Sequence, residues 1–303
     1  MTTSAVRTSP PSLLDPSTVA NRCAAFVGET VESAGANGAV INLSGGIDSS
    51  VTAHLAVDAL GAGAVTGMIL PTDVNRSENI NDARRLAENL GIAYRELEIQ
   101  PILDQFVTAV TSERREVNGD PLDTRRGIMT VPDKERVHLR EGIGNTAARL
   151  RMAIAYFEAN TTERLVLGTG NRTELLVGYF TKHGDGAVDL LPIGDLYKTE
   201  IRELARELGV AERIIEKQPT AGLWAGQTDE DELGVSYETL DTVLWNLRES
   251  DADIEAVATA SDVGAEIVTS IVELYEASEH KRVPPQTPAG VSNWRPERRD
   301  SGT

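Results

Sequence analysis

A polar loop near the N-terminus carries the residue types that bind phosphate. Residues 42–50 read Asn-Leu-Ser-Gly-Gly-Ile-Asp-Ser-Ser; they follow the apolar run 38–41 and lead into a helix-prone stretch. Where a buried strand delivers glycines to a helix N-terminus, unpaired backbone N–H groups face an anion. Asp48 would repel phosphate unless a divalent cation lay between them, so the loop predicts a phosphate site that uses magnesium.

Two common phosphate motifs do not describe this loop. The nucleoside-triphosphate P-loop needs a lysine after its second glycine, and the dinucleotide fingerprint needs spaced glycines. Here no lysine follows Gly46, and Gly45 and Gly46 are adjacent. The remaining pattern, Ser-Gly-Gly-x-Asp-Ser, resembles the signature of the N-type ATP pyrophosphatases, which activate a substrate as an adenylate. A plainer alternative is a tight turn in which Asp48 or Ser49 caps the following helix.

A second transition from strand to glycine loop to helix occurs at residues 165–174, Leu-Val-Leu-Gly-Thr-Gly-Asn-Arg-Thr-Glu. Its Glu174 could cap a first helical turn or, together with Asp48, help to hold one magnesium ion. Lys198 lies in the first turn of a later helix pattern, which we expect Asp195 to cap. A cation is unfavourable at that end of a helix dipole, so Lys198 indicates an anionic ligand.

Charged residues also interrupt two apolar segments. Residues 144–157 form a strong helix pattern with Phe157 on its apolar face, and Arg149 and Arg151 cannot both face a core. We therefore expect at least one of the two arginines to be solvated or paired. Asp189 stands inside a second apolar run, where an unpaired buried carboxylate would be costly, so it needs a partner in the protein or in a ligand.

Strand and helix patterns alternate through the first part of the chain. The strand candidates are residues 38–41, 64–70, 92–99 and 165–167. This alternation predicts an α/β fold, a Rossmann-like parallel sheet with helices on both faces and ligands at the carboxyl ends of the strands. After Ile193 only helix patterns follow, so the C-terminal third should be helical.

We expect residues 1–303 to form a single domain. Residues 1–12 and about 284–303 are predicted to be flexible tails, because they are polar or rich in proline. Residues 111–140 are too polar for a core and indicate a lid or an insertion near a partner chain.

Composition excludes several classes of protein. The 303 residues include 47 acidic and 29 basic ones, a net charge of −18, which disfavours nucleic-acid binding. Such an acidic, lysine-poor chain suggests adaptation to high salt. The single Cys23 excludes an intrachain disulfide and fits with Phe26 and Val27 on the apolar face of an early helix. Without a leader pattern or an apolar run of about 18 residues, a cytoplasmic protein with no membrane partner is expected.

Further motifs carry a more specific resemblance, to the ammonia-dependent NAD synthetases of the N-type ATP pyrophosphatase group. They lie in family order, span about residues 20–285, and occupy residues 44–49, 145–152, 168–174, 180–186, 189–192, 219–221, 232–237 and 279–282. The resemblance implies an adenine nucleotide alpha hydrolase-like fold and a homodimer with the substrate site near its interface. It also implies ATP-dependent amidation of deamido-NAD to NAD, the last step of NAD biosynthesis.

The resemblance further implies roles for individual residues. ATP is expected at Asn42, Leu43, Ser44, Gly45, Gly46, Ile47, Asp48, Ser49, Thr169, Lys198 and Thr220. Mg²⁺ is expected at Asp48 and Glu174, and deamido-NAD at Arg149, Lys182, Asp189, His280 and Lys281. Asp48 and Lys198 would be catalytic through stabilisation of the leaving pyrophosphate. Ala147 stands where the family often has lysine.

The implied reaction has two steps. The nicotinate carboxylate of deamido-NAD attacks the α-phosphorus of ATP and expels pyrophosphate, and ammonia then attacks the acyl-adenylate to give NAD and AMP. Because the carboxylate is already a nucleophile, positioning and charge neutralisation should dominate catalysis. Glutamine-dependent relatives carry an amidohydrolase domain with a catalytic cysteine, which this chain lacks, so free ammonia or ammonia from a separate protein is expected.

Two other functions stay open on the sequence. One is another adenylating pyrophosphatase, such as a GMP synthetase core or a tRNA-modifying enzyme, although the acidic composition disfavours tRNA. The other is a nucleotide sensor of the same architecture that binds ATP without turnover. Two acidic magnesium candidates, Lys198 and the second glycine loop favour catalysis.

Overall fold

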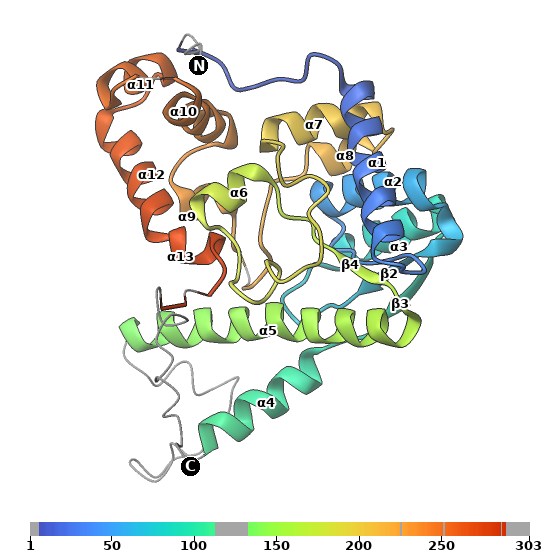
Figure 1. The fold of residues 1–303 in the computed structure, drawn as a ribbon. Helices are drawn as coiled ribbons and strands as arrows, with labels where there is room; N and C mark the ends of the chain where they lie inside the picture. The colour runs from blue at the N-terminus through green and yellow to red at the C-terminus, as the bar shows by residue number, and fades with distance from the viewer. Residues whose placement is uncertain (1–5, 113–132, 225, 251, 286, 289–303) are drawn as a thin grey trace, which may run out of the picture.

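The structure is a computed structural model that describes residues 6–112, 133–224, 226–250, 252–285 and 287–288. A parallel sheet forms the centre of the protein (Figure 1). Its four strands lie in the order β3-β2-β1-β4. They are β1 (Ala39–Asn42), β2 (Val65–Ile69), β3 (Ala93–Glu96) and β4 (Leu165–Leu167). Every strand overlaps a run predicted from the sequence, and every neighbouring pair is parallel, so the α/β prediction is confirmed.

Helices cover both faces of the sheet, as predicted. Alternate residues of β1 separate the two layers: Ala39 and Ile41 pack in the cluster that contains residues of α1 (Pro16–Ser33), α2 (Ile47–Leu60) and α3 (Ser77–Leu90). Val40 packs on the opposite face, against apolar residues of α5 (Asp133–Thr162). The period of two in a strand thus sends successive side chains into two different cores.

The strand order places two loops side by side. From β1 the chain adds β2 and then β3 on one side, whereas β4 pairs with the other side of β1, with Ile41 opposite Leu167. Such a reversal opens a crevice at the carboxyl ends of β1 and β4. The glycine loop after β1 and the loop at residues 168–171 after β4 both end at this crevice.

The C-terminal third is helical, as predicted (Figure 1). The elements that follow β4 are α6 (Arg172–Val177), α7 (Lys198–Glu207), α8 (Glu212–Ile215), α9 (Asp229–Leu233), α10 (Tyr237–Glu249), α11 (Ile254–Ser261), α12 (Ala265–Ala277) and α13 (Glu279–Arg282). The buried apolar residues of α6, α10, α11 and α12 form a separate cluster around Tyr197 and Tyr237, whereas those of α7 and α8 pack with α1 and α2. None of the described helices combines the length and the apolar composition that crossing a membrane requires.

Three expectations about helices need correction. The chain after β3 forms a helix, α4 (Gln100–Ser112), that the sequence patterns did not reveal. Helix α5 begins at Asp133 rather than at residue 144, so the polar residues 133–140 are its first turns. Phe26 and Phe157, both expected to face inward, are 46% and 68% exposed. A helix pattern locates an apolar stripe but does not say how much of it another element covers.

The predicted tails and lid are only partly described. Within the N-terminal segment, Arg7 exchanges hydrogen bonds with the Asn246 side chain at 2.8 and 2.9 Å and lies over the Trp245 ring. This part of the segment is therefore held against α10. Residues 113–132 of the predicted lid and residues 289–303 of the predicted C-terminal tail lie outside the described residues.

Candidate active site

A cavity of about 430 Å³ lies at the carboxyl edge of the sheet. Its walls come from the glycine loop, the end of β2, the middle of α5, the start of α7 and residues 217–224. Of the residues expected at ATP, it is lined by Asn42, Leu43, Ser44, Gly46, Ile47, Asp48, Thr169, Lys198 and Thr220, but not by Gly45 or Ser49. The fold therefore brings together residues from four separate parts of the sequence.

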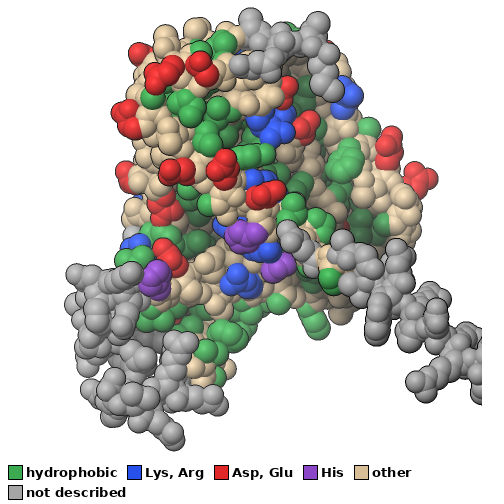
Figure 2. Space-filling model, turned by 60° about the vertical axis from the view of Figure 1, so that its left-hand side comes forward, with side chains coloured by type: hydrophobic (Ala, Val, Ile, Leu, Met, Phe, Trp, Pro, Cys, Tyr) green, Lys and Arg blue, Asp and Glu red, His purple; other side chains and the backbone are tan. Residues whose placement is uncertain are grey.

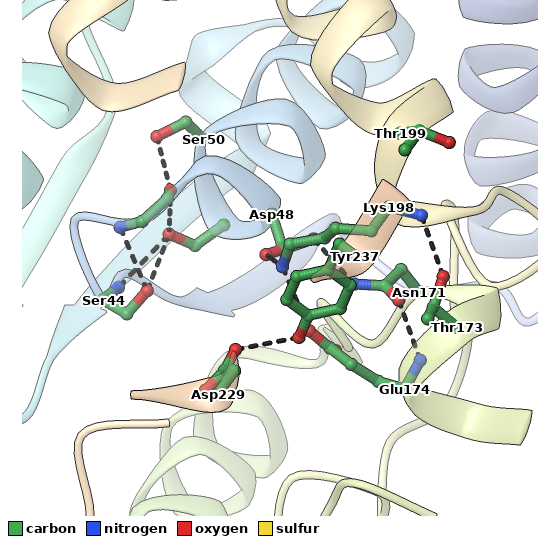
Figure 3. A network of polar contacts seen from close by, with 12 residues as sticks. Ser44, Asp48, Ser50, Asn171, Thr173, Glu174, Lys198, Thr199, Asp229 and Tyr237 are labelled. Carbon is green, nitrogen blue, oxygen red and sulfur yellow. Dashed lines mark hydrogen bonds and ion pairs between the residues drawn. The ribbon is translucent and has the colours of Figure 1, made fainter. Parts of the chain in front are cut away.

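The glycine loop turns directly into α2. Gly46 is the N-cap of this helix, and no side chain caps it, so capping by Asp48 or Ser49 does not explain the motif. The Gly46 N–H donates to Ser44 Oγ at 3.2 Å, and the Ser44 and Ser49 hydroxyls lie 3.1 Å apart. Asp48 is left in the first turn of α2 with its carboxylate directed to the cavity (Figure 3).

One lysine joins the two carboxylates that the sequence assigned to magnesium (Figure 3). Lys198 Nζ lies 2.6 Å from Asp48 Oδ2 and 3.1 Å from Glu174 Oε1, and its side chain is 3% exposed. Burial alone would lower the pKa of Lys198, but the Asp48 and Glu174 carboxylates outweigh it and raise that pKa. Burial raises the pKa of Glu174 to about 7, with Lys198 opposing the change and Asp48 adding to it.

Asn171 fixes the distance between the two loops, a role that the sequence patterns did not reveal. This fully buried residue is the N-cap of α6: its Oδ1 accepts from the Glu174 N–H at 3.0 Å. Its Nδ2 donates to Asp48 Oδ1, also at 3.0 Å. A single amide therefore orients Asp48 and the helix that carries Glu174 (Figure 3). Its place directly after Gly-Thr-Gly, at a helix start, was the available signal.

The start of α7 is held by buried side chains rather than by Asp195. The helix begins at Lys198, whose N–H donates to Thr173 Oγ1 at 2.9 Å. Asp241 accepts from the Thr173 hydroxyl at 2.5 Å and from the Thr199 N–H at 2.8 Å. The Asp195 side chain is 98% exposed and pairs with Arg172, so the predicted cap is wrong. These contacts set where the Lys198 side chain enters the site.

Four of the five residues expected at deamido-NAD do not line the cavity that holds the ATP set. Of these five, only Lys281 lines it; Lys281 donates to the carbonyls of Gly178 and Phe180 at 2.6 and 2.9 Å. Arg149 donates to the Lys182 carbonyl at 3.1 Å, and Lys182 donates to the His280 carbonyl. Figure 2 shows basic and histidine side chains gathered on one face of the molecule, with acidic side chains above them.

Asp189 takes its hydrogen-bond partners from β4 and α5. It is exposed rather than buried, and its carboxylate accepts from the Val166 N–H at 2.7 Å and from the Tyr156 hydroxyl at 3.1 Å. The expected need for a partner is therefore met within the protein. Asp189 thereby links β4 to α5.

Arg151, rather than Arg149, enters the cavity wall. Its Nε donates to the Leu70 carbonyl at 2.9 Å and its Nη2 to Asn75 Oδ1 at 3.1 Å, and burial lowers its pKa. The expectation that one of the two arginines is solvated holds for Arg149, which is exposed. The sequence could not distinguish them, because both follow the same helix pattern two residues apart.

An acidic residue of α9 forms another part of the wall. Asp229 is 3% exposed and accepts from the Tyr237 hydroxyl at 2.8 Å. Burial raises the pKa of its carboxyl, against the opposing effects of Lys198 and of that hydrogen bond. From the sequence, residues 229–232 read only as an acidic stretch, since nothing local distinguishes a buried aspartate from a solvated one.

The parallel sheet with a glycine-rich loop at its carboxyl edge defines an α/β protein of the nucleotide-binding class. The family model for NAD synthase matches residues 19–285. The chain therefore belongs to the NAD synthase family, which confirms the resemblance drawn from its motifs.

Individual relatives agree with this assignment. The chain is 45% identical over 268 residues to the NH3-dependent NAD+ synthetase of Halobacterium salinarum, covering 88% of this chain and 91% of the relative. The solved NMN synthetase of Francisella tularensis has a TM-score of 0.74 at 35% identity, covering 91% of this chain and 100% of the other. The NH3-dependent NAD synthetase of Campylobacter jejuni has a TM-score of 0.69 at 28% identity, with the same coverage.

The pKa of Glu174 makes stability depend on pH. The folded protein raises that pKa from 4.5 to about 7, so the proton is held more tightly in the folded than in the unfolded state. Without nucleotide or metal, this contribution to the free energy of unfolding is lost as pH rises from 4.5 to about 7. Urea unfolding should show the wild type losing stability relative to Glu174→Gln across this range, and parallel curves would contradict the assignment.

Proposed function

We propose that the protein is an ammonia-dependent NAD(+) synthetase, which amidates deamido-NAD to NAD and converts ATP to AMP and pyrophosphate. The observation that carries the proposal is the convergence of Asp48, Glu174 and Lys198 beside the glycine loop, in a cavity at the switch point of the sheet. A nucleotide sensor needs a phosphate loop, but it does not need a buried lysine held between two carboxylates. This arrangement suits a reaction in which charge on phosphate grows and must be neutralised.

Magnesium fits the residues present. Among the described residues no cluster of three His, Cys, Asp or Glu side chains could hold a metal. Magnesium, however, is commonly bound by one or two carboxylates together with substrate phosphates. Asp48 and Glu174 supply such a pair, and Asn42 Oδ1 and Asp229 Oδ1 are buried oxygens of the site without a hydrogen-bond partner. We assign the ion to Asp48 and Glu174, where it would neutralise charge on the leaving pyrophosphate.

The chain's own residues divide the remaining work. Backbone N–H groups of the glycine loop and the Ser44 hydroxyl would bind ATP phosphates, and Thr169 and Thr220 also line the cavity. The Ser49 hydroxyl lies behind Ser44 and would act through its contact with the Ser44 hydroxyl. Lys198, fixed by its two carboxylates, would hold positive charge near the leaving group. Asn171 would keep Asp48 in its orientation between the two loops. Little covalent chemistry is required of the protein, so rigid placement of charge is the main contribution to rate.

The basic group on the outer face suits an anionic second substrate. Arg149, Lys182, His280 and Lys281 gather there in a chain whose net charge is −18, and Lys281 joins the group to the cavity wall. We assign this surface, together with Asp189, to deamido-NAD. A bound dinucleotide would then run from the outer face into the cavity, where its nicotinate carboxylate would meet ATP.

A smaller substrate is the second candidate. The likeness to the Francisella tularensis NMN synthetase favours nicotinate mononucleotide, since its TM-score of 0.74 exceeds the 0.69 of the Campylobacter jejuni NAD synthetase. Both substrates present the same carboxylate to ATP. They differ in the adenylate half, which only a surface beyond the reacting centre can recognise.

We also propose that the protein is a homodimer and works in the cytoplasm. Large apolar side chains are exposed on α4 and α5: Ile102, Phe106, Val110, Val137 and Phe157, which are 42 to 68% exposed. Both helices lie at the same side of the molecule (Figure 1). An apolar surface of this kind is typical of a contact with a second protein. Adaptation to high salt stays a prediction from composition.

Activity on three candidate substrates tests the function directly. Purified protein, Mg²⁺, ATP and ammonium are mixed with deamido-NAD, nicotinate mononucleotide or xanthosine monophosphate, and AMP, pyrophosphate and the amidated product are measured. We expect amidation of deamido-NAD at the highest kcat/KM. Preference for the mononucleotide would support the second candidate, and amidation of xanthosine monophosphate alone, or of none, would exclude the proposal.

Removal of the Asp48 carboxylate should nearly abolish adenylation. Loss of one such electrostatic contact costs about 2.7–4 kcal/mol in the transition state, or roughly 10²- to 10³-fold in rate. The measurement is deamido-NAD-dependent exchange of pyrophosphate into ATP by Asp48→Ala. The matched control is Asp58→Ala, an exposed acidic residue of the same helix, which should exchange at the wild-type rate. Near-normal exchange by Asp48→Ala would show the magnesium assignment to be wrong.

Sedimentation velocity tests the dimer. The wild type should sediment as a dimer, whereas Phe106→Glu and Phe157→Glu should shift it toward monomer, because each places a charge in an apolar contact. Phe26→Glu on α1 is the matched control: Phe26 is 46% exposed but lies on the opposite face of the sheet, so it should leave the dimer intact. A wild-type monomer would overturn the proposal.

A further inference from the structure

A second ion group, centred on the buried carboxylate of Asp82, lies against the glycine loop, and none of its charged residues has been given a role so far. Lys217 Nζ donates to Asp82 Oδ2 at 2.6 Å, to Asn79 Oδ1 at 3.1 Å and to the Gly45 carbonyl at 2.9 Å. Arg213 donates to the other oxygen of the same carboxylate, Asp82 Oδ1, at 2.7 Å. Lys217 also lines the cavity, which makes it the member of the group that reaches the site.

The group carries a net positive charge. Burial alone would raise the pKa of Asp82, but hydrogen bonds from Lys217 and Arg213 outweigh it and lower that pKa, so Asp82 is ionised near neutral pH. One carboxylate then faces two cations. The remaining positive charge lies against the glycine loop, which has the features of a phosphate site, although the whole protein has a net charge of −18.

The lysine acts on the peptide that forms the loop. In a trans peptide the carbonyl and the next N–H point in opposite directions. The carbonyl of Gly45 accepts from Lys217, and the N–H of the same peptide belongs to Gly46, which donates to Ser44 Oγ at 3.2 Å within the loop. A cation on the carbonyl polarises the peptide and makes this N–H a stronger donor toward an anion.

The same lysine spans a close backbone contact. Gly45 has φ of +76°, and a Cβ atom on it would lie 2.1 Å from the Asn79 carbonyl oxygen, so the loop presses against the backbone of α3. Lys217 bonds to both sides of this contact, the Gly45 carbonyl and the Asn79 side chain. It therefore fixes both the place and the orientation of the Gly45–Gly46 peptide.

We propose that Lys217 is a positioning residue for the phosphates of ATP, which it serves by fixing and polarising the Gly45–Gly46 peptide from behind. This role for Lys217 rests on the proposed function in one respect, which is that ATP is the ligand of the glycine loop. Asp82 holds the lysine in place, and Arg213 binds the other oxygen of the same carboxylate.

Calorimetric titration with a non-hydrolysable ATP analogue and Mg²⁺ is the primary test, because it needs no turnover. Lys217→Met should bind the analogue about tenfold or more weakly, as expected for loss of a hydrogen bond to a charged group. In steady-state assays the KM for ATP should rise by a similar factor, while the KM values for deamido-NAD and ammonium stay within about twofold of wild type. Lys217→Arg, which keeps the charge and N–H donors, should recover most of the affinity.

Two control variants test whether Lys217 acts by positioning the Gly45–Gly46 peptide or only by neutralising Asp82. Arg213→Met removes a cation from the same carboxylate and should keep wild-type affinity for the analogue. The double variant Asp82→Asn with Lys217→Met leaves no buried unpaired charge, because the Arg213 side chain is 47% exposed, so it should recover thermal stability but not ATP affinity. Recovery of affinity in the double variant, or unchanged affinity in Lys217→Met, would overturn the proposal.

The outcomes also separate this proposal from the proposed function. A wild-type protein that binds the analogue but amidates no substrate would refute the function, and the Lys217 series would still decide the positioning role. A wild type that binds no nucleotide would overturn both.

Discussion

The buried contact of Lys198 with Asp48 and Glu174 is the interaction on which the site depends. It joins the first turns of α2, α6 and α7. In the chain, Lys198 is 150 residues from Asp48 and 24 residues from Glu174. Removal of Lys198 would leave two neighbouring carboxylates without their cation, and breaking a buried ion pair in this way typically costs about 3–5 kcal/mol. The surrounding hydrogen bonds of Asn171 and Thr173 therefore serve one purpose, which is to keep three charged groups at fixed separations.

The fold explains why these groups meet. Parallel strands end at the same edge, and the reversal of strand order between β1 and β4 places two loops beside each other there. Each loop turns into a helix whose first turn carries one carboxylate. The third helix, α7, starts against the second loop through Thr173 and the buried Asp241, so the lysine in its first turn points at both.

Basic residues give the site positive charge in an otherwise acidic protein. The chain carries a net charge of −18, yet basic residues line the cavity at Lys198 and Lys217 and lie on the outer face at Arg149 and Lys182. Two polyanionic substrates would repel one another in such a protein unless local cations compensated. The arrangement therefore reconciles an acidic surface with chemistry on phosphates.

The sequence by itself determined the four strands, most of the helices and the two glycine loops, because apolar periodicity, glycines and caps act over a few residues. Its family motifs also named Asp48, Glu174 and Lys198. Only the tertiary structure decided that Lys198 pairs with both carboxylates, that Asn171 bridges the loops, that Arg151 rather than Arg149 enters the cavity, and that Phe157 faces outward. The physical reason is separation: Lys217 and Gly45 lie 172 residues apart, and no local pattern records a contact formed only when distant elements pack together.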